Sequence, residues 1–258
     1  MGKVDLHFQP TVPVFDGNMN LGRPHDRRVT VHTAEGTLEA MKKAGVGRAL
    51  VHHPHAAFRD SHDGNGWLME LIEGEPAFVP QFVCNPSFDN LDEFAAEVKE
   101  YGVRSVRLVP TYHMYPFRDW VLGKWLEWFE DEDLPVWIQV DADAANSVPF
   151  DPSAVHDTIK DHPNLRFILS EFNYQIALWV YPFLRSLPNV YAECSKFIST
   201  NWVPELIEVS SVDRVLYGSG FPTGPLAPQL YTIHRSGLSD EHLRAVCSGN
   251  LERLLNGA

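Results

Sequence analysis

The sequence predicts an α/β protein in which strand–helix units close into a single (β/α)8 barrel over residues 1–258. Short runs rich in Val, Ile and Leu recur along the chain and alternate with amphipathic stretches. Most of these runs lack apolar–polar alternation, which is typical of strands covered on both faces. The length of 258 residues also suits one α/β barrel.

Eight strands are predicted in chain order: residues 4–8, 47–53, 78–85, 103–110, 135–141, 165–172, 189–195 and 214–220. Helices are predicted between them, for example over residues 35–43, closed by Gly45, and from an N-cap at Asp89 to a stop at Gly102. A doubly wound open sheet is the alternative. That fold usually places a glycine-rich turn after its first strand, whereas "HFQPTVP" contains no glycine.

Composition excludes several classes of partner. The chain carries 34 acidic and 21 basic residues, a net charge of −13, which disfavours binding to nucleic acid or to an anionic membrane. No apolar run reaches the length of a membrane span. The three cysteines are widely spaced, so we expect no disulfide framework and a cytoplasmic location, with Cys194 in the core.

Several phrases resemble the amidohydrolase superfamily, specifically its amidohydrolase-2 branch, over residues 4–255. "VDLHFQP" resembles the opening Asp-x-His-x-His strand, "HPNLRFILSEFNY" the sixth strand, "NVYAECS" the seventh, "DRVLYGSGFP" the eighth, and "GNLERLL" the closing helix. The resemblance implies a barrel related to hydrolases, lactonases and decarboxylases, with a homodimer as a possible assembly.

In that family a divalent metal is held by two histidines of strand one, single histidines of strands five and six, and an aspartate of strand eight. Carried over by position, these ligands fall on His7, Gln9, Gln139, Glu171 and Gly220. One residue of five retains the expected type, and neutral amides are weak ligands for zinc. We therefore expect neither a metal nor another cofactor, and a chemistry other than the family's usual one.

Strand alternation selects the side chains that can meet at the barrel mouth. From Glu171, Leu169 and Asn173 are expected to point inward. We predict Glu171, His7 and Arg107 as catalytic residues. The predicted substrate contacts are Gln9, Gln139, Asp141, Asn173, His52, His53, Tyr112 and His113.

Each catalytic candidate has a structural alternative. Partial burial could raise the pKa of Glu171 toward neutrality for acid/base work, or the carboxylate could pair with Arg107 or His7. His7 could shuttle protons or be held by a neighbouring carboxylate. Arg107 could clamp a substrate carboxylate or neutralise Asp141 or Glu171.

The favoured function is a metal-independent hydrolase or lyase that acts by acid/base chemistry on a small carboxylated or aromatic molecule. Two alternatives stay open: an inactive descendant that binds a small molecule or a protein, and a hydrolase with a shifted metal site on His7, Glu171 and a loop histidine. The histidines at 52, 53, 55 and 62 are interpreted as part of a solvated or substrate-lining loop rather than as a replacement metal site, because the adjacent His52 and His53 point to opposite faces of a strand.

Overall fold

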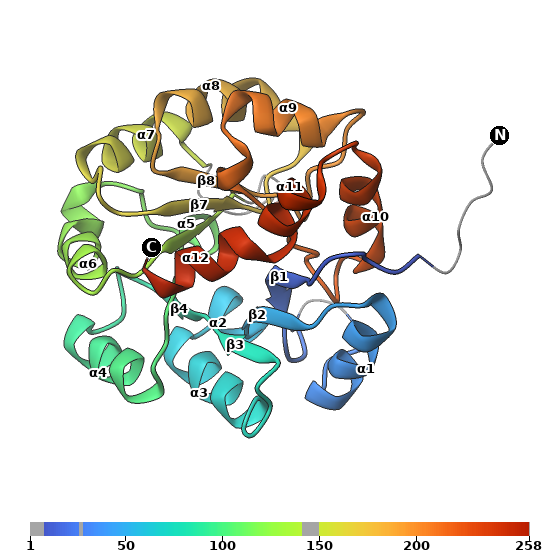
Figure 1. Cartoon of the computed structure of the whole chain (residues 1–258). Helices are drawn as coiled ribbons and strands as arrows, with labels where there is room; N and C mark the ends of the chain where they lie inside the picture. Colours follow the sequence, from blue (N-terminus) through green and yellow to red (C-terminus); the bar gives the residue numbers. More distant parts are fainter. Residues whose placement is uncertain (1–7, 26–27, 141–149, 258) are drawn as a thin grey trace.

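The computed structural model describes residues 8–25, 28–140 and 150–257. It confirms the (β/α)8 barrel (Figure 1). The strand segments of the described part are β1 (Phe15–Asn20), β2 (Arg48–His52), β3 (Phe78–Pro80), β4 (Phe82–Cys84), β5 (Val106–Leu108), β6 (Val136–Gln139), β7 (Phe167–Ser170), β8 (Val190–Glu193) and β9 (Val215–Leu216). Only Gln81 separates β3 from β4, so these two segments form one barrel strand.

All neighbouring strands pair in parallel, in the orders β1-β2-β3 and β4-β5-β6-β7-β8-β9. The segment after β9 returns to β1 and closes the ring: Met19 pairs with Phe221, and Gly17 N donates to Tyr217 O at 2.9 Å. The C-terminal ends of all strands therefore meet at one mouth, where barrel enzymes hold their chemistry.

Helices surround the strands (Figure 1). The described part contains α1 (Ala34–Ala44), α2 (Pro54–Phe58), α3 (Ser61–Leu71), α4 (Leu91–Tyr101), α5 (Pro110–His113), α6 (Asp119–Asp131), α7 (Pro152–Asp161), α8 (Ala177–Ser186), α9 (Trp202–Val209), α10 (Ala227–Arg235), α11 (Asp240–Arg244) and α12 (Asn250–Asn256), with short turns of helix η1 (Tyr174–Ile176), η2 (Val212–Arg214) and η3 (Ala245–Gly249). None of these helices is long and apolar enough to cross a membrane.

The helix ends follow ordinary capping rules. Gly45 and Gly102 end α1 and α4 in the left-handed conformation, as the sequence predicts. The N-cap of α4 is Asn90 rather than Asp89, since the Asn90 side chain accepts from two backbone N–H groups of the first turn. The Asp89 carboxylate instead accepts from Ser61 Oγ at 2.7 Å.

The first strand is where the sequence prediction is wrong. The first barrel strand that the structure describes is β1, residues 15–20, and Phe8 lies outside any strand, while residues 4–7 lie outside the described residues. Gln9 lies outside the barrel: its Nε2 donates to Lys43 O, at the C-terminal end of α1, and its side chain is exposed. Because α1 leads into the start of β2, this contact lies at the opposite end of the barrel from the mouth, so Gln9 is no site residue.

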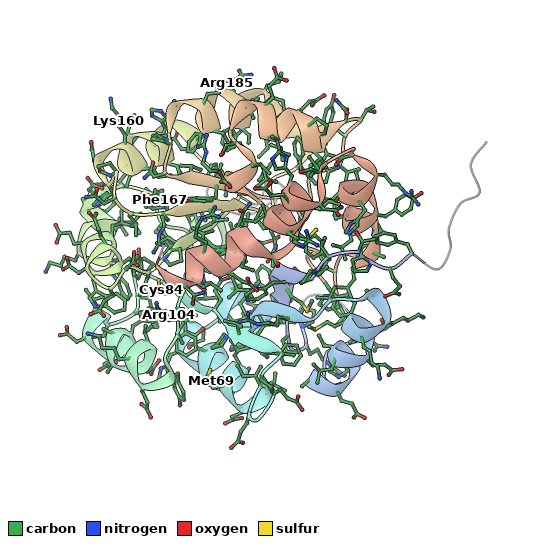
Figure 2. All side chains as sticks on the ribbon, in the orientation of Figure 1. Met69, Cys84, Arg104, Lys160, Phe167 and Arg185 are labelled. Carbon is green, nitrogen blue, oxygen red and sulfur yellow. The ribbon has the colours of Figure 1, made fainter. Side chains whose placement is uncertain are left out.

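Inside the barrel the side chains form an apolar layer below a polar one. The apolar layer holds Phe15, Leu50, Trp137, Ile168 and Leu216, and α12 closes it with Leu251, Leu254 and Leu255. Figure 1 shows α12 crossing this end. Side chains also fill the space between strands and helices (Figure 2).

The polar layer lies one step nearer the mouth. It contains Asn18, His52, Gln81, Arg107, Gln139, Ser170 and Glu193, all buried. Strand register explains the change of layer, because Trp137 pairs with Ile168 and, two residues on, Gln139 pairs with Ser170. The candidate site is built on this buried polar layer.

Candidate functional site

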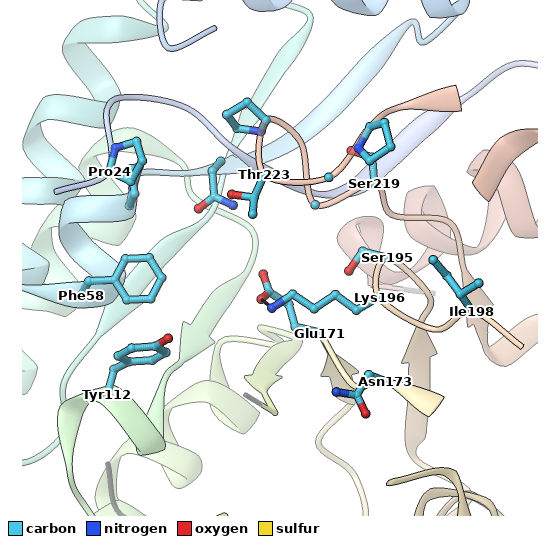
Figure 3. A pocket seen from close by; sticks show the side chains of 16 residues that line it. Pro24, Phe58, Tyr112, Glu171, Asn173, Ser195, Lys196, Ile198, Ser219 and Thr223 are labelled. Atoms are coloured by element: carbon cyan, nitrogen blue, oxygen red, sulfur yellow. Dashed lines mark ion pairs between the residues drawn. The ribbon is translucent and has the colours of Figure 1, made fainter. Parts of the chain in front are cut away.

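A cavity of about 380 Å³ opens at the mouth of the barrel. It is lined by Asn20, Pro24, Pro54, Phe58, Tyr112, Glu171, Asn173, Ser195, Lys196, Ile198, Ser219, Gly220, Pro222, Thr223, Gly224 and Pro225. Its walls differ in character. Phe58 and Tyr112 face Glu171 and Lys196 across the space in Figure 3. An apolar, aromatic wall thus stands opposite a charged one, and small-molecule pockets commonly combine apolar and aromatic walls with a few polar groups.

The charged wall is an ion pair between Glu171, which follows β7, and Lys196, in the loop after β8. Lys196 Nζ lies 2.8 Å from Glu171 Oε2, and the Glu171 side chain is 8% exposed (Figure 3). Burial alone would raise the pKa of Glu171, but the positive charges of Lys196 and Arg107 outweigh burial and hold this pKa below its ordinary value. Glu171 is therefore an ionised carboxylate, and the expectation of a pKa raised toward neutrality is wrong.

The backbone of Glu171 has the left-handed conformation, with φ at 60°. Such a conformation costs a non-glycine residue roughly 1–2 kcal/mol, so it persists only where neighbouring contacts hold it. This conformation also ends the strand alternation at Glu171. Ile168 and Ser170 face the barrel interior, whereas Leu169, which was predicted to point inward, packs in the core between strands and helices. The turn aims the Glu171 carboxylate into the cavity.

Arg107, on β5, is fully buried below the cavity and does not line it. Its Nε donates to Gln81 at 2.7 Å, one terminal nitrogen to Gln139 at 3.2 Å and Ser170 at 3.3 Å, and the other to Asn18 at 2.8 Å. All four acceptors are neutral. The guanidinium is thus committed to the protein, which contradicts its predicted role as a clamp on a substrate carboxylate.

A second carboxyl, that of Glu193 at the end of β8, is buried behind the cavity wall. Its oxygens accept from Ser195 N, from Ser195 Oγ at 3.0 Å and from Asn18 Nδ2 at 3.0 Å. Burial, reinforced by the negative charge of Glu171, raises the pKa of Glu193 to about 8. Two acids of the same site are therefore held in different protonation states at neutral pH.

Asp16 anchors the first strand to the last. Its Oδ1 accepts from the backbone N–H groups of Asn18 and Ser219, each at 3.0 Å, and burial raises its pKa to about 6. β1 reads Asp16-x-Asn18-x-Asn20, which has the spacing of the amidohydrolase Asp-x-His-x-His strand. Asn18 and Asn20 end the first barrel strand that the structure describes, whereas His7 lies outside the described residues.

Of the positions that the resemblance assigns to metal ligands, Gln139, Glu171 and Gly220 lie at the mouth end of the barrel, beside Asn18 and Asn20 of β1. The amide oxygens of Asn18 and Gln139 both accept from Arg107, whose positive charge opposes a divalent cation beside it. In the part of the chain that the structure describes, no cluster of three or more His, Cys, Asp and Glu residues could hold a metal. This donor set does not fit zinc or manganese.

The other predicted contacts are divided between the cavity and the core. Tyr112 and Asn173 line the cavity. Gln139 and His52 are buried in the polar layer, and burial lowers the pKa of His52, so it is neutral. His7 and Asp141 lie outside the described residues.

His53 and His113 flank the cavity without lining it. The His53 ring caps α2 by accepting from His55 N at 3.0 Å, and burial lowers its pKa to about 4. His113 is half-buried in α5, and burial lowers its pKa as well. The His53 ring therefore stabilises the start of α2, the helix that carries Phe58.

Sequence reasoning missed Lys196, Ser195, Glu193 and the asparagines of β1. The acid in "YAECSK" was interpreted as part of an ordinary strand, although an acid and a lysine around the end of a barrel strand are a usable signal. The spacing of "DGNMN" was the second available signal. Cys194 is buried, as predicted.

Comparisons with known proteins agree with this architecture. The amidohydrolase family profile, Amidohydro_2, matches residues 4–257. A comparison with curated proteins gave no match.

Solved structures match over 95% of this chain. They include 5-carboxyvanillate decarboxylase from Sphingomonas paucimobilis (13% identity, TM-score 0.71, 99% of that chain covered). A dihydroxybenzoic acid decarboxylase from Polaromonas sp. JS666, with bound manganese and the inhibitor 2-nitroresorcinol, matches at 12% identity with a TM-score of 0.75 over 97% of that chain. A 2,6-dihydroxybenzoate decarboxylase from Rhizobium matches at 12% identity with a TM-score of 0.74 over 99% of that chain. At these identities the likeness is one of fold, whereas the profile match spans almost every residue, and the chain belongs to the amidohydrolase family.

Proposed function

We propose that this protein is a metal-independent lyase that removes a carboxyl group from a small carboxylated aromatic molecule by acid/base chemistry. The observation that carries the proposal is the Glu171–Lys196 ion pair on one wall of the cavity, opposite the aromatic wall of Phe58 and Tyr112. A flat ring would pack on the aromatic wall while its acidic substituents reach Lys196.

The aromatic wall suits such a ring. The rings of Phe58 and Tyr112 pack edge to face with centroids 4.6 Å apart, and together they present an apolar aromatic surface to the cavity. Fold neighbours that decarboxylate dihydroxybenzoate and carboxyvanillate support the same class of substrate.

The absence of a metal requirement is supported by the buried network. Arg107 uses the oxygens of Asn18 and Gln139, and Gly220 has no side chain to offer a metal. The permanent charge of Arg107 lies at the base of the site, and Lys196 adds a second positive charge at the cavity surface. These cations would stabilise negative charge on a bound substrate.

Hydrolysis is a second candidate, favoured by one observation. The positive charges of Lys196 and Arg107 lower the pKa of Glu171, so at neutral pH this residue is a base at the cavity surface. A carboxylate in that state could take a proton from an attacking water, with Lys196 beside the oxyanion that forms.

The test is turnover by protein passed over a chelator, with its metal content measured. The compounds are 2,6-dihydroxybenzoate and 5-carboxyvanillate, assayed for CO2 release, and aryl lactones, assayed for ring opening. Glu171→Gln and Lys196→Gln should each lower turnover by about 10²–10⁴-fold. Lys124→Gln, on the exposed face of α6, is the matched control and should leave turnover unchanged.

Turnover that requires stoichiometric manganese or zinc would overturn the metal-independent reading. Full activity of Glu171→Gln would remove this residue from the mechanism. Tight binding of 2,6-dihydroxybenzoate without turnover of any compound would favour the inactive descendant.

A further inference from the structure

The Ser195 hydroxyl connects the cavity to a buried acid. Ser195 lines the cavity (Figure 3). Its Oγ lies 3.0 Å from Glu193 Oε2 and 3.1 Å from Asn18 Nδ2. Glu193 itself is fully buried and does not line the cavity. The hydroxyl is therefore the link between this carboxyl and anything bound in the cavity.

The Glu193 carboxyl is held in place from several sides. Ser195 N donates to Oε1, while Asn18 Nδ2 and Glu171 N donate to Oε2 at 3.0 and 3.4 Å. The backbone of Gly218 packs against Oε1 so closely that a Cβ atom at that position would overlap it. Such a carboxyl exchanges protons most directly through Ser195.

We propose that Glu193 and Ser195 form a proton relay, in which the Ser195 hydroxyl passes a proton from the Glu193 carboxyl to the substrate atom that must be protonated. This inference rests on the proposed function, and it supplies the acid that the reaction needs. Glu171 cannot fill this role at neutral pH, because it is held as a carboxylate by Lys196.

The protonation state of Glu193 determines which way the Ser195 hydroxyl hydrogen points. When Glu193 is ionised, Ser195 Oγ donates to it. When Glu193 is protonated, it donates to Ser195 Oγ, which also accepts from Asn18, so the hydroxyl hydrogen is free to point at a ligand. The protonated state is thus the one in which Ser195 can act as a donor.

The proton balance closes for decarboxylation. The bond between the ring carbon and the carboxylate breaks, CO2 leaves, and the electron pair stays on the ring carbon. That carbon takes the Ser195 hydroxyl proton, and Ser195 Oγ takes the Glu193 proton. Glu193 remains as a carboxylate and recovers a proton from water through Ser195 after product release.

The charges around Glu193 are consistent with this assignment. Glu171 is the nearest negative group and favours the neutral form, while Arg107 opposes it with its positive charge. Burial dominates both effects and raises the pKa of Glu193 to about 8, so the acid carries its proton at neutral pH. A neutral Glu193 also exerts no charge repulsion on an anionic substrate.

The first experiment uses the turnover assay described above. Glu193→Gln copies the hydrogen bonds of the protonated acid but has no proton to transfer, and Ser195→Ala breaks the link. Each should lower kcat by about 10²–10⁴-fold with little change in KM, and the double variant should be no slower than the slower single variant. Ser195→Thr keeps a hydroxyl and should retain most of the rate. Glu205→Gln is the matched control, since Glu205 accepts from Tyr181 Oη at 2.9 Å away from the cavity.

Additive losses in the double variant, or full activity of Glu193→Gln, would overturn the relay while leaving the proposed function intact. A second measurement needs no substrate. Infrared spectra at neutral pH should contain a protonated-carboxyl band that is lost in Glu193→Gln and shifted in Ser195→Ala. If no compound is turned over, the proposed function fails, and this band still tests the protonated Glu193 and its hydrogen bond to Ser195 that the relay requires: its absence, or its indifference to Ser195→Ala, would contradict the inference.

Discussion

The buried guanidinium of Arg107 allows the sharpest stability prediction. Arg107→Met keeps a side chain of similar length but removes the donors that serve Asn18, Gln81 and Gln139. Each buried acceptor that loses its partner costs about 1–3 kcal/mol, which gives about 3–9 kcal/mol for three amides. Methionine does not carry the desolvation cost of the guanidinium, and freed amides can partly pair with one another, so we expect the lower part of this range, about 3–5 kcal/mol.

For a chain of this size, 1 kcal/mol corresponds to roughly 2–4 °C in Tm, so Arg107→Met should melt about 6–20 °C lower. The assay is equilibrium unfolding in urea followed by tryptophan fluorescence, with a thermal scan. Arg118→Met is the control, because the exposed Arg118 lies 3.5 Å from Asp157 and 3.8 Å from Asp151. Such surface pairs contribute about 0–1 kcal/mol.

A loss for Arg107→Met no larger than that for Arg118→Met would refute the reasoning. It would mean that the polar layer is satisfied by other groups and that Arg107 is not the cation around which the site is organised.

Three further predictions concern the two carboxyls. In Lys196→Gln the pKa of Glu171 should rise toward its ordinary 4.5. In the unchanged protein, ionised Glu171 contributes stability that is present above pH 4.5 and is lost as pH falls through its lowered folded-state pKa. The loss of unfolding free energy in Lys196→Gln, measured in urea, should therefore become smaller in acid. The raised pKa of Glu193 contributes stability that is fully present below pH 4.5 and is lost as pH rises to about 8. Glu193→Gln should therefore remove a decrease in the free energy of unfolding of at most about 1.4 kcal/mol per pH unit between those values. An unchanged pH dependence would contradict a buried, protonated Glu193. Gly218→Ala should destabilise by about 1–3 kcal/mol through overlap with Glu193, whereas Gly123→Ala, in α6 with open space around it, should be neutral or stabilising by about 0.5–1 kcal/mol; equal effects would be contrary to this packing.

The error in the first strand shows what periodicity cannot detect. "FDGNMN" contains a glycine, an aspartate and two asparagines, residue types that are depleted in strands. It forms β1 because β2 lies on one side and the segment after β9 on the other, and their backbones satisfy its hydrogen bonds. No local pattern carries that information.

Glu171 shows a different limit. Its place at the end of a barrel strand follows from the sequence pattern, and the structure puts it on the cavity wall. The direction of its pKa shift depends on Lys196, which approaches from the loop after the next strand. Glu193 has the opposite shift because burial, reinforced by the negative charge of Glu171, outweighs the Ser195 hydrogen bonds and the Arg107 charge, which lower its pKa.

By itself the sequence determined the barrel, seven of its strands and the family, since hydrophobic runs and short motifs are local properties of the chain. Only the tertiary structure decided which residues form the site and in which protonation state. Charge and hydrogen bonding depend on distances between strands far apart in sequence, and the packing around Arg107, Glu171 and Glu193 sets those distances.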